Sequence, residues 1–370
     1  PTPLRRLFDY RAGPANGHAL EAGTRVRVPF GRRNLVGIAM EIAIGSELPE
    51  ERLKPVLERL DRQPIFDPAG LALLGWAADY YHHPIGEVLA AALPKALRLG
   101  AALEPIEERW VLTAEGRDAQ ARGEPRRAPR QRQLLAALAQ AEAAGVGWPD
   151  PSTRAEWRDA ARALIARGWL AVIEVTPATA DSVAAALGSP ASEPIVLGPG
   201  PEPNDEQRAA IERIGGSLGV FGAFVLHGVT GSGKTEVYLR VVERALRLGR
   251  GALVLVPEIG LTPQLVSRFR QRFAAPMAVL HSALTDHERL LAWREAFSGR
   301  ARVVLGTRSA VFAPVKDLGV IIVDEEHDTS FKQHDGGFRY SARDLAVVRA
   351  QRAGVPAVLG SATPALETLQ

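Results

Sequence analysis

Residues 225–235 read VLHGVTGSGKT, and this stretch decides how the second half of the chain folds. Its apolar start is typical of a buried strand, and a G-x-x-x-x-G-K-T pattern follows at 228–235. Apolar residues then recur at helical spacing over 236–248. A strand, a glycine-rich loop and a helix together allow backbone N–H groups to surround phosphate oxygens. The stretch therefore predicts a phosphate-binding loop.

Each residue type in this loop has its own expected task. The glycines let the backbone approach the phosphates closely, and here they are Gly228, Gly231 and Gly233. Lys234 is expected to contact the β- and γ-phosphates of ATP, and the Thr235 hydroxyl to bind Mg²⁺. A chance glycine-rich turn is the alternative, and the flanking strand and helix argue against it.

A second stretch, VIIVDEEH at 320–327, is an aliphatic run that ends in acidic residues. An aspartate at the tip of a buried strand can bind Mg²⁺, so Asp324 is a second predicted metal ligand. The next residue, Glu325, can orient and deprotonate an attacking water molecule. An acidic cluster alone is usually a solvated turn, but this one follows four aliphatic residues and a phosphate-binding loop. We therefore predict that Lys234, Asp324 and Glu325 belong to one hydrolytic site.

Apolar runs and helical patterns alternate along the rest of this half. We expect strands at 224–226, 252–256, 278–280, 303–305, 320–323 and 357–359. We expect helices at 206–214, 236–248, 263–272, 286–297 and 342–352. Such alternation predicts a parallel α/β sheet, in which ligands lie at the carboxyl ends of the strands. The phosphate-binding loop and the acidic residues both fall at such ends.

The first hundred residues have a different pattern. Strands are expected at 24–29 and 35–44, joined by a hairpin at 30–34. Helices are expected at 67–81 and 85–99. This part is therefore predicted to be a small β-rich domain.

The middle of the chain predicts a third kind of unit. Strands are expected at 110–113 and 169–175, and helices at 130–144 and 153–167, which fits a winged-helix module. Residues 177–203, rich in Ala, Pro, Gly and Ser, are expected to be a linker. The predicted fold class is multidomain α/β. Its domains are the β-rich domain at 1–104, the winged-helix domain at 105–176 and a RecA-like parallel lobe at 204–370.

Composition limits the remaining possibilities. The 370-residue chain has no cysteine, which excludes disulfides and thiolate metal sites. It shows no apolar run of membrane-spanning length and no signal-peptide pattern at its start, so a cytoplasmic location without a membrane partner is expected. Its net charge is only +3, but arginines gather near the start and between 117 and 132. Such patches indicate a polyanion partner, although a basic run alone is more often a solvated face.

Several motifs occur together in one order. In the second half they lie at 228–238, 256–264, 306–310, 324–327 and 360–364, and in the first half at 8–10, 26–31 and 76–86. This set, which covers the whole chain and is highly specific, resembles the PriA family of bacterial replication-restart helicases of superfamily 2. The last motif of the second half, GSATP, corresponds to helicase motif III of that family.

The resemblance implies an ATP-dependent 3′→5′ DNA helicase that recognises stalled or repaired forks and starts primosome assembly. The implied cofactors are ATP and Mg²⁺. The implied partners are forked and single-stranded DNA, the nascent leading-strand 3′ end, single-strand DNA-binding protein and primosome proteins, and a monomer is expected. The family continues with a zinc-binding region and a second lobe that are not in this chain. We therefore expect a fragment that binds DNA, hydrolyses ATP poorly and does not unwind DNA.

The resemblance also implies roles for single residues. Four residues are implied to line the pocket for the terminal nucleotide of a DNA 3′ end: Phe8, Asp9, Gly31 and Lys54. In the lobe, Gln207 is implied to read adenine, and His327 to relay between nucleotide and DNA. Ser361 and Thr363 are implied to sense that change.

The segment 330–344 interleaves aromatic and basic residues. This mixture is typical of a loop whose rings stack on bases and whose cations contact phosphates, and a merely packed loop is the alternative. It resembles the loop that couples DNA binding to hydrolysis in the family. The predicted DNA-binding residues here are Phe331, Lys332, Phe338, Arg339, Tyr340 and Arg343.

Two other functions remain open at this level. The chain could be a non-enzymatic module that binds DNA 3′ ends or forks, but its intact ATPase motifs argue against this. It could also be a different superfamily 2 P-loop translocase, and the segments 8–10 and 76–86 argue against that. A DNA affinity that ignores a free 3′-hydroxyl would favour the second alternative.

Overall fold

A computed structural model describes residues 5–12, 19–103, 107–143, 154–175, 196–198, 200–334 and 336–369. The chain divides into two compact units. One unit combines Pro1–Leu103 with Ser192–Gln370, and the other is Glu104–Ala191. In the described ranges, no helix combines the length and the apolar character needed to cross a membrane.

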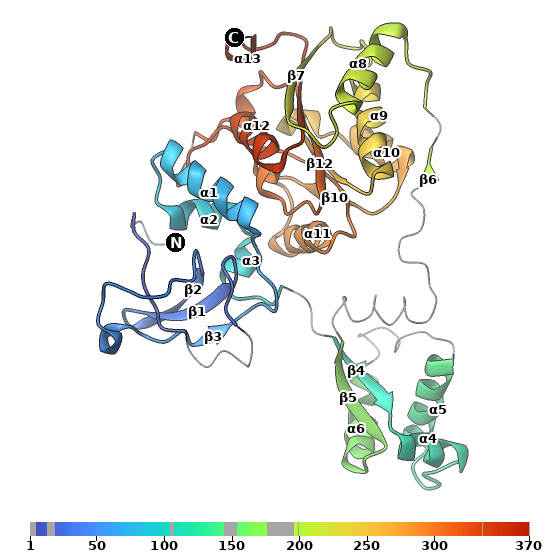
Figure 1. The fold of residues 1–370 in the computed structure, drawn as a ribbon. Coiled ribbons are helices and arrows are strands. Elements are labelled where there is room, and N and C mark those ends of the chain that lie inside the picture. The colour runs from blue at the N-terminus through green and yellow to red at the C-terminus, as the bar shows by residue number, and fades with distance from the viewer. Residues whose placement is uncertain are drawn as a thin grey trace. The chain divides into compact units, whose positions relative to one another are not determined.

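A six-stranded parallel sheet forms the centre of the first unit (Figure 1), with the strand order β10-β11-β8-β12-β13-β7. Its strands are β7 (Gly222–His227), β8 (Gly251–Leu255), β10 (Met277–Leu280), β11 (Val303–Gly306), β12 (Leu318–Asp324) and β13 (Pro356–Ser361). Strands β8, β11 and β13 are buried along their whole length, as expected for aliphatic runs covered on both faces. The parallel α/β prediction is therefore confirmed.

Helices accompany these strands. They are α8 (Asp205–Gly215), α9 (Lys234–Arg247), α10 (Pro263–Arg272), α11 (Asp286–Ser298), α12 (Ala342–Ala353) and α13 (Leu366–Leu369). Of these, α9 to α12 lie between the strands in sequence. Short 3₁₀ turns lie between them: η3 (Glu258–Gly260), η4 (Arg308–Phe312) and η5 (Thr329–Phe331). Each longer predicted helix of this half is present, and Asn204 and Thr285 cap α8 and α11 with reciprocal side-chain hydrogen bonds.

The predicted linker at 177–203 needs a correction at its end. Most of it, 177–195 and residue 199, lies outside the described residues. Val196–Leu197 forms β6, which pairs antiparallel with β9 (Phe273–Ala274) after α10. Residues 196–197 therefore belong to the sheet structure of the lobe, since their backbone groups bond to β9.

The small N-terminal sheet has the order β2-β1-β3 and is antiparallel. Strands β1 (Arg25–Phe30) and β2 (Arg33–Ile38) form a two-residue hairpin in which Gly31 has a φ of +59°. A glycine adopts this left-handed conformation at little cost. The predicted second strand is wrong beyond Ile38, because residues 41–50 are exposed and unpaired with β1. The short strand β3 (Glu58–Arg59) was not predicted.

Four helical segments complete this region: η1 (Glu50–Arg52), α1 (Pro68–Tyr80), α2 (Ile85–Ala92) and α3 (Lys95–Arg98). The single helix predicted for 85–99 is wrong, since the chain is extended at Leu93 and restarts after Pro94. Proline disfavours helical conformation in the residue before it.

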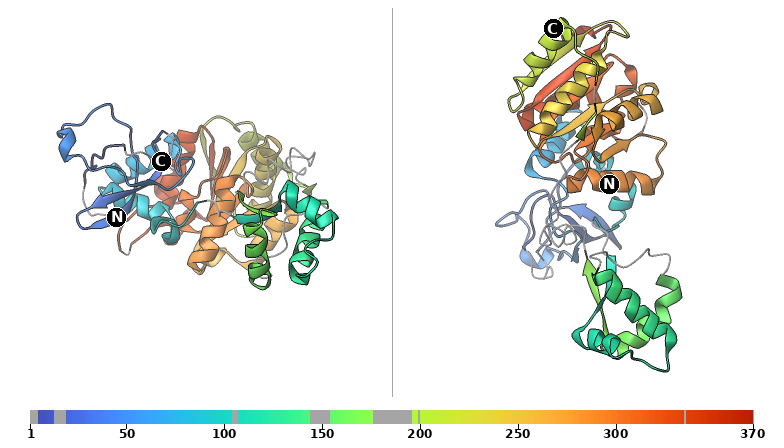
Figure 2. Two further views of the ribbon diagram at one scale, coloured as in Figure 1. Left: turned by 90° about the horizontal axis from the view of Figure 1, so that it is seen from below. Right: turned by 90° about the vertical axis from the view of Figure 1, so that its right-hand side faces the viewer.

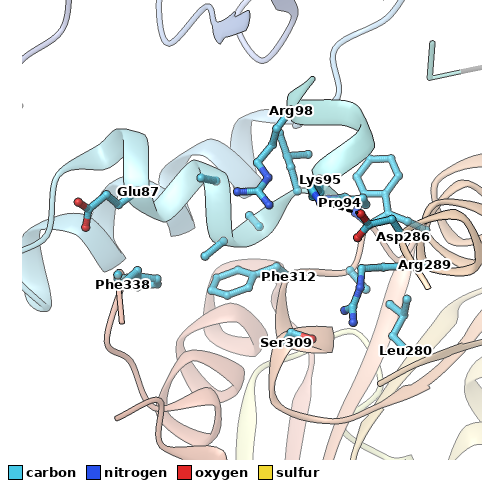
Figure 3. Close-up of a pocket in the computed structure, with 17 residues that line it drawn as sticks. Glu87, Pro94, Lys95, Arg98, Leu280, Asp286, Arg289, Ser309, Phe312 and Phe338 are labelled. Carbon is cyan, nitrogen blue, oxygen red and sulfur yellow. Dashed lines mark ion pairs between the residues drawn. The ribbon is translucent and has the colours of Figure 1, made fainter. Parts of the chain in front are cut away.

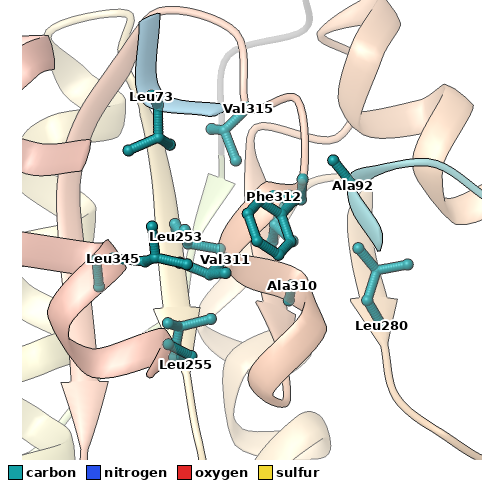
Figure 4. Close-up of a cluster of buried hydrophobic side chains, with 14 of the residues drawn as sticks. Leu73, Ala92, Leu253, Leu255, Leu280, Ala310, Val311, Phe312, Val315 and Leu345 are labelled. Atoms are coloured by element: carbon teal, nitrogen blue, oxygen red, sulfur yellow. The ribbon is translucent and has the colours of Figure 1, made fainter. Parts of the chain in front are cut away.

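Helices α1 and α2 pack onto the lobe. Leu73 and Ala92 join one hydrophobic cluster with Leu253, Leu255 and Leu345 (Figure 4). In both views of Figure 2 the blue helices lie beside the yellow-to-red lobe. The N-terminal region and the lobe therefore share a core.

The second unit, described by itself, pairs β4 (Glu107–Leu112) antiparallel with β5 (Leu170–Val175). Three helices accompany the pair: α4 (Ala114–Ala121), α5 (Pro129–Ala143) and α6 (Arg154–Ala166). Leu112, Leu134, Leu164 and Leu170 form its core. Helix α4 was not predicted. The winged-helix assignment stays a prediction.

Candidate nucleotide and DNA site

The phosphate-binding loop connects the carboxyl end of β7 to the first turn of α9. Gly231 and Gly233 have φ values of +82° and +84°, a conformation that side chains with a Cβ rarely adopt. A Cβ on Gly228 would lie 2.6 Å from the Ser232 hydroxyl oxygen. The three glycines therefore fit the turn for separate reasons, two for conformation and one for space.

Lys234 lies at the start of α9 and is buried. Its Nζ donates to the carbonyl oxygen of Gly228 at 2.7 Å and lies 3.4 Å from Glu325 Oε1. The structure thus brings the predicted phosphate-binding lysine and the predicted water-activating carboxylate together. The Thr235 hydroxyl follows directly on the same first turn of the helix.

Gln207 connects α8 to this loop. Its Oε1 accepts from the Asn204 backbone N–H, and its Nε2 donates to the Ser232 carbonyl oxygen at 2.9 Å. These bonds use one of the two N–H donors and one of the two lone pairs of the amide. The side chain therefore lies beside the phosphate-binding loop, and its role in reading adenine stays a prediction.

Asp324 ends β12 and is held by Tyr238. The Tyr238 hydroxyl donates to Asp324 Oδ1 at 2.8 Å. Burial raises the pKa of Asp324, and the Tyr238 hydrogen bond opposes this effect. Burial also raises the pKa of Tyr238, so the phenol stays protonated and can donate a hydrogen bond to Asp324.

Glu325 is one of the few described non-glycine residues with a positive φ, +47°. This conformation is uncommon for a residue with a side chain, and it is often found at functional sites. The turn directs successive side chains to different partners. Glu325 lies beside Lys234, and its Oε2 is 3.7 Å from His327 Nδ1.

Glu326 points inward from the same turn, and its side chain is fully buried. It accepts from the Ala365 backbone N–H at 2.7 Å and from the Thr368 hydroxyl at 2.9 Å. Arg343 Nη1 donates to it at 3.3 Å. Glu326 was not predicted from the sequence, although its position between Glu325 and His327, both predicted catalytic residues, could have indicated a role. Arg343, whose predicted contact with DNA stays a prediction, makes ion pairs with Glu326 and Asp344.

His327 contacts the strand-end segment of β13. Its Nδ1 lies 2.7 Å from the Ser361 hydroxyl oxygen, which also accepts from the Thr363 backbone N–H at 3.0 Å. The structure therefore brings together the histidine and the two residues that were expected to sense its movement.

The aromatic residues of segment 330–344 lie in a different environment from the one expected. Phe331, Phe338 and Tyr340 are only 2%, 4% and 7% exposed, because they pack in the shared core. Phe338 contacts the rings of Tyr81 and His83 after α1. Base stacking by these three rings would require them to leave that packing. Burial also raises the pKa of Tyr340 to about 12.

The basic residues of this segment are better placed for DNA. Lys332 and Arg339 are exposed. Arg308, in the 306–310 motif, donates to the carbonyl oxygens of Ser330 and Lys332 at 3.0 Å. The motif therefore holds the segment in position while two cations face solvent.

A pocket of about 690 Å³ lies between α2–α3 and the lobe. Figure 3 shows Phe312 and Phe338 on the lobe side of the pocket, and Lys95 and Arg98 on the α2–α3 side. Arg289 lies at the end of the pocket away from Phe338. Within the described residues, the Nε of Arg98 is buried without a hydrogen-bond partner, as is the Nε1 of another lining residue, Trp293. Buried N–H groups without partners favour a ligand that carries acceptors.

Two of the four predicted 3′-end residues adjoin the β1–β2 hairpin, because Gly31 lies in its turn and Phe8 packs beside it. The Phe8 ring contacts Phe30, which precedes Gly31, with ring centroids 5.2 Å apart. Asp9 is exposed and accepts a hydrogen bond from the Ser46 hydroxyl. Lys54 is exposed, and its carbonyl oxygen accepts from the Arg11 backbone N–H at 2.9 Å. Sequence reasoning missed Ser46, for which no motif gave a signal.

The donor set at the strand ends fits Mg²⁺. Thr235 and Asp324 supply hydroxyl and carboxylate oxygens, and Mg²⁺ prefers oxygen ligands. Over the described ranges, no three His, Cys, Asp or Glu side chains gather into a metal-binding group. Mg²⁺ at nucleotide sites takes one or two protein oxygens together with phosphates and water, so it needs no such group.

Comparison with known proteins gives two family matches. A family model described as the 3′DNA-binding domain (3′BD) of PriA matches residues 1–94, and one described as DEAD/DEAH box helicase matches 204–370. Replication restart protein PriA of Haemophilus influenzae is 42% identical over 375 residues, which cover 99% of this chain and 49% of that protein. Its namesake in Bacillus subtilis is 33% identical over 431 residues, with 99% and 52% covered. The chain spans about half the length of these curated relatives.

Proposed function

The chain belongs to the PriA family of replication restart proteins, and on this premise we propose that it carries the 3′-end-binding domain and the first motor lobe of an ATP-dependent 3′→5′ DNA helicase. The helicase recognises stalled or repaired replication forks and starts primosome assembly there. Its cofactors are ATP and Mg²⁺. Its proposed partners are forked and single-stranded DNA, single-strand DNA-binding protein and primosome proteins, and it acts as a monomer.

One observation carries the hydrolytic part of the proposal: Lys234 Nζ lies 3.4 Å from Glu325 Oε1. The two residues come from motifs far apart in sequence, and they meet at the carboxyl ends of β7 and β12. Ligands bind at this edge of parallel sheets. This proximity supports the proposal that Lys234 binds phosphate and that the neighbouring Glu325 carboxylate activates water.

The geometry supports a simple sequence of events at this site. The phosphates of ATP attract Lys234 away from Glu325, because they carry more negative charge than one carboxylate. Glu325 Oε1 is then free to accept a proton from the attacking water, whose oxygen bonds to the γ-phosphorus while the bond from that phosphorus to the β–γ bridging oxygen breaks and ADP leaves. Thr235 and Asp324 are the residues that would hold Mg²⁺, which would neutralise charge on the phosphates when bound.

Buried contacts of the lobe support coupling between this site and DNA. Lys332 and Arg339 are proposed to contact the DNA backbone from the segment that precedes α12. Arg343, in the first turn of α12, pairs with Glu326, the neighbour of Glu325. A shift of the segment on binding DNA would therefore act on the turn that carries the catalytic residues. The pocket lined by Arg98 and Phe312 is proposed as an additional contact for the DNA strand.

The N-terminal domain is proposed to hold the 3′ end of the nascent leading strand. The exposed Asp9 carboxylate can accept a hydrogen bond from a 3′-hydroxyl, and the Phe8 ring, beside the turn at Gly31, is proposed to stack on the terminal base. Lys54 is exposed and can balance a phosphate. A 3′-phosphate would instead place negative charge against Asp9.

We therefore expect this chain to prefer a fork with a leading-strand 3′-hydroxyl over one with a 3′-phosphate by about tenfold, since hydrogen bonds to charged groups contribute roughly 1.5–3 kcal/mol. Asp9→Ala should remove the preference. Fluorescence anisotropy with labelled forks measures both affinities at a fixed salt concentration. Glu47→Ala, which changes another exposed carboxylate of this domain, is the matched control and should keep the preference. Equal binding of the two ends by the unmodified chain would contradict the 3′-end assignment.

A further inference from the structure

We infer that Tyr238 is a positioning residue for the nucleotide site: its hydroxyl holds Oδ1 of Asp324 and, together with the Glu325 backbone N–H that also bonds to this carboxylate, limits the rotation of the proposed Mg²⁺ ligand. This inference rests on the proposed function and deepens it, because it assigns to a phenol the orientation of the metal ligand. No motif role was predicted for Tyr238 beyond its place in the 228–238 segment.

The position of Tyr238 on α9 makes this contact possible. Tyr238 lies three residues after Thr235 and four after Lys234, so the three side chains lie on adjacent parts of one helix face. The phenol is 2% exposed, and its hydroxyl donates to Asp324 Oδ1 at 2.8 Å. The helix that begins at the phosphates therefore also reaches the tip of β12 one turn later.

Gly360 supplies independent evidence that this space is shaped for the phenol. It pairs with Asp324 in the parallel register of β12 and β13. A Cβ at Gly360 would lie only 1.6 Å from the Tyr238 hydroxyl oxygen. Any larger residue at 360 would therefore displace the phenol. Gly360 does not have a positive φ, so close approach, and not backbone conformation, explains the glycine.

The chemistry of metal ligands explains why such a contact matters. A carboxylate that rotates freely presents either oxygen and spends time in orientations that do not bind the metal. Hydrogen bonds from outer residues fix ligand orientation, and their loss typically weakens metal affinity by about 10- to 100-fold. The Lys234–Gly228 contact does not involve Asp324, so it should remain when the Tyr238 hydroxyl is removed.

The test uses the 370-residue chain and fluorescently labelled ADP, titrated in EDTA and over a series of Mg²⁺ concentrations. Tyr238→Phe keeps the ring and removes the donor. We expect it to need about tenfold more Mg²⁺ for half of the metal-dependent gain in affinity, with binding in EDTA unchanged within about twofold. Tyr80→Phe, at an exposed ring outside this site, is the matched control and should behave like the unmodified chain. Gly360→Ala should raise the Mg²⁺ requirement in the same way.

The outcomes separate the inference from the function on which it rests. An unchanged Mg²⁺ requirement in Tyr238→Phe overturns the inference while leaving nucleotide binding established. An equal loss of affinity with Mg²⁺ and in EDTA also overturns it, because it shows that the phenol only supports the fold. If the unmodified chain binds no nucleotide under either condition, the proposed function fails as well.

Discussion

Asp61→Ala is expected to destabilise the N-terminal sheet by about 3–5 kcal/mol, the cost of leaving a buried charge without its partner. The Arg25 and Asp61 side chains are both fully buried, and Nη2 of Arg25 lies 2.6 Å from Oδ1 of Asp61. A second bond joins Nε to Oδ2 at 2.8 Å. The same guanidinium donates to the carbonyl oxygens of Leu97 and Ala101. Arg25 thus connects β1 by hydrogen bonds to residues 97–101, which follow α2.

Hydrogen exchange of the β1–β3 amides in the whole chain measures this effect, since it reports the free energy of local opening. Glu58→Ala is the matched control. Glu58 pairs with Arg27 at 2.8 Å on the same sheet, but both side chains are partly exposed, so its loss should cost only about 0–1 kcal/mol. Similar protection losses in the two variants would show that burial does not govern the Arg25–Asp61 pair.

Lys234→Ala is expected to weaken the binding of Mg²⁺–nucleotide by about 100-fold. Truncating one partner of a buried charged contact typically costs 2–5 kcal/mol, which spans this factor. Lys234 is buried with its ammonium between Gly228 and Glu325, so few other groups can replace it at the phosphates. Isothermal titration with ATP and Mg²⁺ measures the change.

Lys316→Ala serves as the control, because it removes an exposed lysine from the same lobe. It should bind nucleotide as the unmodified chain does. A loss of less than about threefold in Lys234→Ala would place the nucleotide phosphates somewhere other than the 228–235 loop.

The lobe was the most predictable part of the fold. Each of its six strands follows from a short aliphatic run, and β12 ends at a residue with a predicted chemical role, Asp324. The strand order was not predictable, because neighbouring aliphatic runs such as β8 and β11 carry no information about which strand lies beside them. The two-residue strands β3 and β6 gave no pattern at all.

In the candidate site, too, the sequence predicted which residues come together better than it predicted what each side chain contacts. The motif positions of Lys234 and Glu325 predicted a common site because the loop that precedes Lys234 and the acidic turn at Glu325 each follow the carboxyl end of a strand. The composition of segment 330–344 could not show that Phe338 faces Tyr81, because a ring packs equally well against a base or another ring. The break between α2 and α3 could have been predicted from Pro94 itself. The prediction of one helix over 85–99 gave more weight to the spacing of the apolar residues.

The left-handed backbone conformation at Glu325 implies that selection for stability and selection for activity favour different residues at position 325. Glycine and asparagine fit a φ of +47° better than glutamate, and β-branched residues fit it worst. In a library of all residues at 325, screening by protease resistance should therefore enrich glycine and asparagine. Screening the same library for ATP turnover in a full-length relative should retain glutamate. The proposed catalytic residue would then be one that the fold tolerates, at a cost of about 1–3 kcal/mol.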